Sequence, residues 1–406
     1  MTEFSQGGPL PGADLCEEAP LRALDAHCEE VAREFRAAGA RLDRDPDAID
    51  GLMQLPGVRF LRQVLLPAEY RSQPLDVSPG LVDAALSAPG LAILIERYAY
   101  GDAGVILASP GPSLSGGVID RLATPEQRDC YFSRLASGPV HTFFGLTEPG
   151  KGSAVTELAT SLTPRPGGGW VLSGEKCYIG NGTRAQMGVV FCRRAPGPWG
   201  IEAVLLDTSS PGFSAEPLPM MGLRGARISR LVFDDVCVPP ESLLGAHLPP
   251  SRRGLQGATQ ALYRVRPGIG AMAVGCAQAS CDYLRLHRPA LRGADRPRLD
   301  HMLNRVAAAR RLVHRVAADL HRGLVSTHRI GAAKTQAAHT AEDATLLAAE
   351  LLGPAALVEH PWLEKTCRDV RAFELMEGTT NLHRLSVFHG LMKGTFFGVG
   401  PTGRGS

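Results

Sequence analysis

The chain has no excess of either charge. Its 406 residues include 43 basic and 41 acidic ones, which gives a formal net charge of +2. Proteins that bind nucleic acid usually carry a concentrated basic face, so we expect no nucleic-acid partner. The sequence also lacks an apolar run of the about 18 residues that a membrane-spanning helix needs. We therefore expect no membrane partner either.

The cysteines follow no pattern. There are nine, an odd number, and no two of them form a Cys-x-x-Cys pair. Disulfide-stapled domains and structural zinc sites need regular cysteine spacing, so we predict neither, and no metal site. Scattered cysteines, with an N-terminus that lacks a basic-then-apolar signal pattern, predict a protein of the reducing cytoplasm.

The overall composition is that of a folded protein. Hydrophobic residues make up 44% of the chain and charged residues 21%, both close to globular averages. A packed core is therefore expected, and the length suggests two or three domains. The acidic N-terminus, about the first 18 residues, is expected to be partly disordered.

Three regions differ in their hydrophobic pattern. In residues 1–140, apolar side chains recur every three or four positions, as on one face of a helix. The clearest stripe is formed by Leu21, Leu24, Cys28, Val31 and Phe35. Residues 141–248 hold short apolar runs between Gly, Pro and Ser clusters, which predicts a small antiparallel β domain. From 249 to 406 the helical period returns in long amphipathic stretches, which predicts a helical bundle.

Local signals predict several helix boundaries. Residues 80–108 have a helical pattern that is interrupted near Pro89. A helix should begin at Pro125, because Thr124 can cap it, proline suits the first position, and Gln127 can bond back to the cap. The segment 287–298 is rich in Arg and Pro, and we expect it to be a loop.

Three segments carry a resemblance to a known family. They are FFGLTEPGKGSAVTELATSL at 143–162, LSGEKCYIGNG at 172–182 and RDVRAFELMEGTTNLHRL at 368–385. Together and in this order they resemble the acyl-CoA dehydrogenase family, and the resemblance covers roughly residues 90 to 395. It implies a mainly α fold with a central β domain: an N-terminal helical domain, a middle antiparallel β domain and a C-terminal four-helix bundle.

The resemblance implies an FAD-dependent oxidation of an acyl thioester, of coenzyme A or of an acyl carrier protein, to the 2-enoyl thioester. The α-proton of a thioester is weakly acidic, so its removal needs a positioned base and a hydrogen bond to the carbonyl oxygen. Glu377 matches the family's base, and Gly378 lets the backbone lie close to the acyl group. Arg266 matches an arginine near the base, and with Met376 and Ser153 it is expected beside the substrate.

The same resemblance implies a set of flavin contacts. Tyr178 matches an aromatic residue that flanks the flavin ring, a task that suits its flat apolar face. The start of the last helix is suited to an anion such as the flavin diphosphate. The residues expected to bind FAD are Phe144, Leu146, Thr147, Gly152, Ser153, Tyr178, Gly180, Thr379, Asn381, Arg288 and Gly353.

The sequence departs from the family pattern at several of these positions. Gly180 stands where a hydroxyl residue usually bonds the flavin ring, and Leu291 and Arg292 replace a Phe-Gly pair. Glu350 and Pro354 replace a Gln and a Gly that grip the diphosphate from a neighbouring subunit. A carboxylate opposes a diphosphate and proline has no N–H to donate, so this half of the site is expected to be altered.

Two alternative functions stay open. One is a flavin monooxygenase on the same fold, although such an enzyme needs no α-proton base. The other is a flavin-free relative that uses the thioester pocket for non-redox chemistry or for binding alone. For the dehydrogenase, the resemblance implies an electron-transfer flavoprotein as the electron acceptor and a homodimer or homotetramer as the assembly. The departures suggest a pathway-specific enzyme of specialised metabolism acting on a carrier-bound acyl group.

Overall fold

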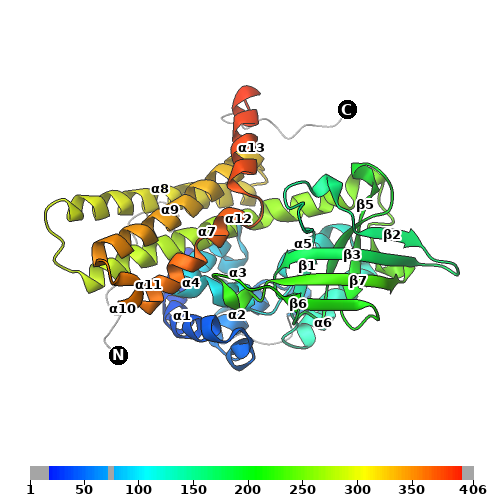
Figure 1. Ribbon diagram of the computed structural model, residues 1–406, viewed down its shortest axis with the longest axis horizontal. Helices are drawn as coiled ribbons and strands as arrows, with labels where there is room; N and C mark the ends of the chain where they lie inside the picture. Colours follow the sequence, from blue (N-terminus) through cyan, green and yellow to red (C-terminus); the bar gives the residue numbers. More distant parts are fainter. Residues whose placement is uncertain (1–17, 72–76, 396–406) are drawn as a thin grey trace.

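The computed structural model describes residues 18–71 and 77–395; the disorder predicted for the start of the chain falls on residues 1–17, outside these ranges. A helical body and a β-sheet domain lie side by side, and the long helix α7 (Leu255–His287) connects them (Figure 1). The order along the chain is helical, β, helical, which confirms the predicted fold class.

Among the described residues, six α-helices precede the sheet. The first, α1 (Ala19–Arg44), buries the whole predicted stripe from Leu21 to Phe35. The last, α6 (Pro125–Ser137), has the predicted capping box, in which Thr124 and Gln127 each accept a hydrogen bond from the other's backbone N–H. Between them lie α2 (Pro56–Val64), α3 (Pro79–Leu86), α4 (Ala88–Ala108) and α5 (Ser113–Leu122).

The predicted interruption near Pro89 is a sharp bend between α3 and α4. Ser87 ends α3 and caps α4, because its hydroxyl accepts a hydrogen bond from Gly90 N at 3.0 Å. The two helices meet at 97°. Within the described ranges no single helix is long and apolar enough to cross a membrane, and only this bent pair passes such a test by length and composition.

The strands form one sheet in the order β6-β7-β3-β2-β4-β5-β8, with β1 paired to β4. Their bounds are β1 (Thr142–Gly145), β2 (Ser161–Pro164), β3 (Trp170–Ile179), β4 (Met187–Arg193), β5 (Ile201–Asp207), β6 (Phe213–Pro217), β7 (Ser229–Val238) and β8 (Leu243–Leu244). Most pairs are antiparallel as predicted, but β1 runs parallel to β4, which corrects the expectation of a purely antiparallel domain. Helices α5 and α6 pack on one face of the sheet.

The last region is a bundle of long helices with shorter ones after it. They are α8 (Asp295–His321), α9 (Thr327–Leu352), α10 (Ala356–Glu359), α11 (Pro361–Asp369), α12 (Ala372–Leu375) and α13 (Thr380–Met392). The loop predicted at 287–298 is shorter than expected, because α8 already begins at Asp295.

The N-terminal helices and the bundle share one hydrophobic core. A buried polar network crosses it: Glu96 of α4 accepts hydrogen bonds from Arg310 at 2.6 Å and lies 3.0 Å from His314, both on α8. The two helical regions therefore form a single body in space. The divisions 1–140, 141–248 and 249–406 stay our proposed domain boundaries along the chain.

Candidate active site

The loop after β1 is shaped by a buried ion pair. The Lys176 ammonium on β3 donates to the Glu148 carboxylate at 2.8 Å and to the main-chain oxygen of Leu146 at 3.2 Å. Cys177 N donates to Thr147 O at 2.9 Å. Three consecutive residues of the loop are thus fixed against β3, so the backbone at 146–148 is held rigidly.

Glu148 also ties this loop to the next strand. Its carboxylate accepts hydrogen bonds from Ala159 N, Thr160 N and the Thr160 hydroxyl at 2.5, 2.8 and 2.6 Å. Burial alone raises its pKa, but the bonds from Lys176 and Thr160 outweigh that effect and lower the pKa below its ordinary value. In the segment between these anchors, Gly150, Gly152 and Ser153 are exposed, and a Cβ added at Gly150 would meet no atom within 4 Å.

Tyr178 projects from an irregular point at the end of β3. The register between β3 and β7 shifts between Lys176 and Ile179, and Tyr178 lies in that shift with φ +62°. A positive φ is unfavourable for a bulky side chain. The ring is nevertheless 64% exposed. An aromatic ring held in a strained backbone position without protein packing is a flat surface available to a ligand.

The residues after Tyr178 connect the sheet to the helical body. A Cβ on Gly180 would lie 4.0 Å from Ile228 Cδ1 and near no closer atom, so the site has room for a side chain that this sequence lacks. Asn181 N donates to Ala226 O at 2.8 Å. In the same loop, Leu223 N donates to the Asp369 carboxylate of α11 at 2.6 Å. The TEPG and KCYIGNG segments are thus joined through residues 222–228 to α11, which is separated from Glu377 by α12.

Glu377 lies in a tight turn between α12 and α13. Its φ is +54°, and that of Gly378 is +100°. Arg266 Nε donates to the main-chain oxygen of Glu377 at 2.8 Å. The Lys334 ammonium of α9 donates to the main-chain oxygens of Glu374 at 2.9 Å and of Gly378 at 2.8 Å. Two cations therefore hold three carbonyl groups of this turn.

These bonds are strong enough to hold an unfavourable backbone. A non-glycine residue in the left-handed region costs about 1–2 kcal/mol. Hydrogen bonds to charged groups contribute about 1.5–3 kcal/mol each. The bonds from Arg266 and Lys334 therefore exceed the cost at Glu377, whose left-handed conformation is dictated by its surroundings.

The carboxyl group of Glu377 has the properties of a general base. Burial raises its pKa to about 7, against the opposing effect of Arg266 and Lys334, which favour the charged form. A carboxylate whose pKa is close to neutral is a stronger base than an ordinary one. Its backbone N–H donates to no acceptor within the described chain, so it is available to a ligand.

His383 packs behind the turn. It is 3% exposed, and its Nε2 lies 3.2 Å from the position that a Cβ on Gly378 would take. Burial lowers its pKa to about 4, and the positive charges of Arg266 and Lys334 act in the same direction. His383 is therefore neutral near pH 7, and it adds no third positive charge beside the base.

The start of α13 follows directly. The Thr379 hydroxyl accepts a hydrogen bond from Leu382 N at 3.4 Å and caps the helix. Thr379, predicted to contact the flavin, thus also has a structural role. Asn381 is exposed on the first turn of α13, and Met376 is partly buried against the main core.

Two of the predicted cofactor residues lie far from Arg266 and Lys334. Arg288 ends α7, 22 positions after Arg266, which corresponds to about 33 Å along the helix. Gly353 ends α9, 19 positions after Lys334. Arg288 donates to Leu351 O and pairs with Asp295 at 3.0 Å. Within one chain, Arg288 and Gly353 are therefore at the opposite end of the bundle from Glu377.

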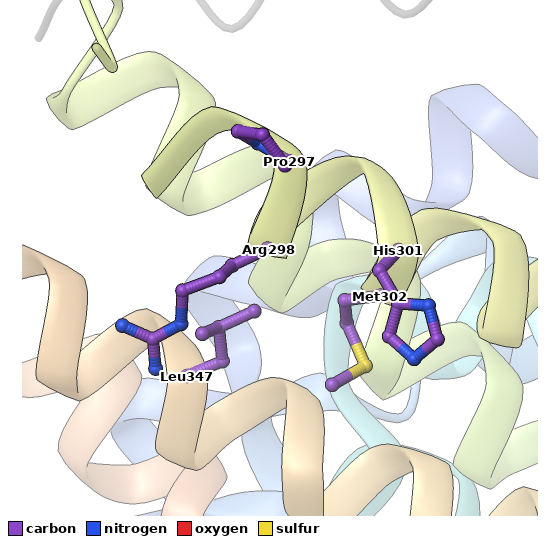
Figure 2. Close-up of a pocket in the computed structure, with 5 residues that line it drawn as sticks. All are labelled: Pro297, Arg298, His301, Met302 and Leu347. Atoms are coloured by element: carbon purple, nitrogen blue, oxygen red, sulfur yellow. The ribbon is translucent and has the colours of Figure 1, made fainter. Parts of the chain in front are cut away.

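The altered position Glu350 also lies at this far end. Its carboxylate is paired with Arg298 of α8 at 2.6 Å, so its charge is partly neutralised. Beside this pair is a shallow apolar hollow of about 330 Å³. Arg298 and Leu347 lie on one side of it, and His301 and Met302 lie on the other (Figure 2).

Sequence reasoning did not single out Glu148 or Lys176. The sequence did contain an indication of this lysine's burial. Lys176 is four residues after Leu172 on β3, and side chains at even spacing on a strand share a face, so Lys176 points to the same face as the fully buried Leu172. A lysine on the buried face of a strand needs a charged partner. The nearby TEPG motif contains that partner.

The chain matches two models of one protein family. Residues 143–236 match the middle domain of acyl-CoA dehydrogenases, and residues 252–392 match the C-terminal domain. An acyl-CoA dehydrogenase of Bacillus subtilis is 33% identical over 305 residues, which cover 72% of this chain and 79% of that protein. An acryloyl-CoA reductase (NADH) of Anaerotignum propionicum is 32% identical over 289 residues, covering 68% and 72%.

Solved structures share the fold at lower identity. Butyryl-CoA dehydrogenase of Megasphaera elsdenii has a TM-score of 0.77 at 24% identity, and the match covers 91% of this chain and 98% of that one. The prolyl acyl carrier protein oxidase AnaB has a TM-score of 0.80 at 21% identity, with 92% and 99% covered. At these identities the likeness establishes the fold.

Proposed function

Because the chain belongs to the acyl-CoA dehydrogenase family, we propose that it is an FAD-dependent oxidoreductase acting on a CH–CH bond, which converts an acyl thioester to its 2-enoyl thioester with Glu377 as the base. One observation carries the proposal. Glu377, a half-buried residue, combines a carboxyl group of raised pKa with a free backbone N–H. An α-proton abstraction needs both.

The Glu377 carboxylate takes the α-proton of the thioester. As the proton leaves, negative charge develops on the thioester oxygen, and a hydrogen bond to that oxygen lowers the barrier. The Glu377 N–H donates this bond, and Gly378 allows the turn that presents it, because its φ is +100° and a Cβ there would lie 3.2 Å from His383 Nε2. After the transfer the proton stays on the Glu377 carboxyl oxygen. Arg266 and Lys334 keep the turn in place during this step.

The residues around the sheet fit a flat, charged cofactor such as FAD. Tyr178 offers an exposed ring, and the loop from Gly150 to Ser153 is open. Lys176 and Cys177 fix the backbone of Leu146 and Thr147, and Phe144 lies just before them on β1. When bound, FAD would accept the hydride that leaves the β-carbon. Structures of the same fold include PigA with FAD and proline, at 18% identity and a TM-score of 0.78.

The acyl carrier is either coenzyme A or a carrier protein. The two curated relatives are named for coenzyme A thioesters, and AnaB is named for an acyl carrier protein. Partly buried Met376, one residue before the base, gives the pocket an adaptable wall. A competition assay with matched thioesters decides between the carriers, and a preference for a simple fatty acyl-CoA would exclude a role in specialised metabolism.

Exposed apolar side chains support an oligomer. The helix α13 extends away from the bundle (Figure 1), and it exposes Leu382, Leu385, Phe388, Leu391 and Met392 at 39–72%. Apolar patches of this kind usually mark protein contacts. We propose a homodimer or homotetramer, with an electron-transfer flavoprotein as the electron acceptor and the cytoplasm as the compartment.

The absorption spectrum of the purified protein tests the proposal. Bands of an oxidised flavin that bleach when an acyl thioester is added are the expected result. Glu377→Gln should keep the bands and lose the bleaching. A protein that stays colourless after reconstitution with FAD would refute the redox reaction and favour the flavin-free relative. Oxygen consumption coupled to hydroxylation would instead indicate a monooxygenase.

A further inference from the structure

Lys334 differs from the other two fully buried lysines of the described chain in what it binds. Lys176 pairs with Glu148, and Lys365 pairs with Asp102 at 2.6 Å. Lys334 is only 1% exposed, yet within the described residues it forms no ion pair and donates only to backbone oxygens. Burying an ammonium without a bonded carboxylate is unfavourable. A lysine at this buried position is therefore expected to have a specific role.

The two oxygens that Lys334 binds bracket the base. Glu374 O is at the end of α12, and Gly378 O is one residue beyond Glu377. One ammonium therefore ties together the two ends of a five-residue segment. With Arg266 bound to Glu377 O from α7, the segment is held from two different helices. The left-handed backbone at Glu377 lies inside this clamp.

We propose that Lys334 is a positioning residue, which acts through the backbone oxygens of Glu374 and Gly378 to hold Glu377 in the left-handed conformation that presents its carboxylate and its N–H to the same thioester. The effect of Lys334 on turnover rests on the proposed function, in which Glu377 is the base. Its effect on the backbone conformation of Glu377 does not. Without the ammonium, φ at residue 377 should return to negative values, since no other side chain of the described residues bonds both Glu374 O and Gly378 O.

The charge of Lys334 has a second effect on the base. Arg266 from α7 and Lys334 from α9 act on the Glu377 carboxyl group, and His383 from α13 lies against its backbone. Tyr263 from α7 interacts with Arg266, and Glu374 from α12 interacts with Lys334. His383 is neutral near pH 7, so Lys334 and Arg266 are the two cations. Removing one cation disfavours the carboxylate, and the pKa of Glu377 should therefore rise further.

The test compares Lys334→Met with the matched control Lys365→Met, which removes another buried lysine that does not contact the turn. Misplacing a reacting group by about 1 Å costs on the order of 100-fold in rate. We expect Lys334→Met to lower kcat by about 100-fold with little change in KM, and to move the rising limb of the pH–rate profile to higher pH. Lys365→Met should lower the Tm without moving that limb. Lys334→Arg, which keeps the charge and the donors, should restore part of kcat.

A crystal structure of Lys334→Met gives the readout that is independent of turnover. A negative φ at residue 377 supports the proposal, and a φ near +54° would overturn it, as would a pH–rate profile that Lys334→Met leaves unmoved. The proposed function fails separately, if Glu377→Gln in the otherwise unchanged chain still bleaches the flavin. Loss of φ +54° together with an active Glu377→Gln would keep the positioning role and reject the base.

Discussion

The Lys176 ammonium and the Glu148 carboxylate are 2.8 Å apart, and both side chains are buried where the loop after β1 meets β3. Burial lowers the pKa of Lys176, while the bond from Lys176 lowers the pKa of Glu148, so each group is kept charged mainly by the other. Each charge is thus stabilised by the other, and Glu148 is stabilised also by Ala159 and Thr160.

Removing one member should therefore be worse than removing both. Lys176→Met leaves Glu148 buried without its cation, and breaking such a pair costs about 3–5 kcal/mol of unfolding free energy. The double variant Lys176→Met/Glu148→Gln should be more stable than Lys176→Met alone. Urea unfolding of the four proteins in this cycle measures the difference. Additive losses would contradict the pairing.

Glu377 should destabilise the folded chain above neutral pH. Its folded pKa of about 7 lies above its ordinary value of 4.5, so between these values the folded state binds more protons and stability falls as pH rises. Glu377→Gln should therefore be more stable than the parent at pH 8, by up to about 3 kcal/mol. At pH 4.5 or below the two should be equal. A difference that is constant from pH 4.5 to 8 would refute the raised pKa.

The same group predicts the pH dependence of turnover. Only the ionised carboxylate can accept the α-proton, so the rate should rise with pH through an apparent pKa of about 7. Single-turnover bleaching between pH 5.5 and 8.5 measures it. A rate that does not change over this range would assign the proton transfer to another group.

Tyr178→Gly should separate folding from cofactor binding. Glycine tolerates φ +62° without strain, and the lost ring is 64% exposed, so the protein without cofactor should gain about 1 kcal/mol of stability. The same change removes the ring offered to the flavin, and FAD retention should fall. Thermal unfolding and the flavin-to-protein absorbance ratio measure the two effects. Unchanged FAD retention would remove Tyr178 from the site.

Glu96 should make the helical body sensitive to acid. Burial alone raises its pKa, but Arg310 and His314 lower it to about 2. The stabilisation is therefore present above pH 4.5 and is lost as the pH falls towards 2. Glu96→Gln should cost about 3–5 kcal/mol at pH 7, because it leaves Arg310 buried and unpaired. The loss should shrink at pH 3, and denaturant unfolding at both pH values checks this.

The parts of the fold that were predicted correctly are those with a long local period. The stripe of α1 and the capping box at Thr124 are local features, and both were confirmed. Two strands left no such pattern. β2 has one buried residue among four, and β6 has none among five, so neither alternates clearly enough to be recognised. The parallel pairing of β1 with β4 depends on long-range contacts that no local pattern encodes.

The candidate site was predictable to a similar extent. The resemblance pointed to Glu377 and Arg266, which the fold brings into contact across 111 residues. It did not indicate that Lys334 would bond the backbone. Every residue type has a main-chain oxygen, so the sequence does not show which residues a lysine binds in this way. It also grouped Arg288 with the flavin residues, although one chain holds Arg288 about 33 Å from Arg266.

That separation makes α7 a rigid spacer. A single chain cannot bring both ends of α7 to one small molecule, so a cofactor held both by Arg288 and by residues next to Arg266 would have to be shared between two copies. Cofactor retention would then follow protein concentration: dilution below the dissociation constant of the assembly would release the cofactor and the partner in the same step.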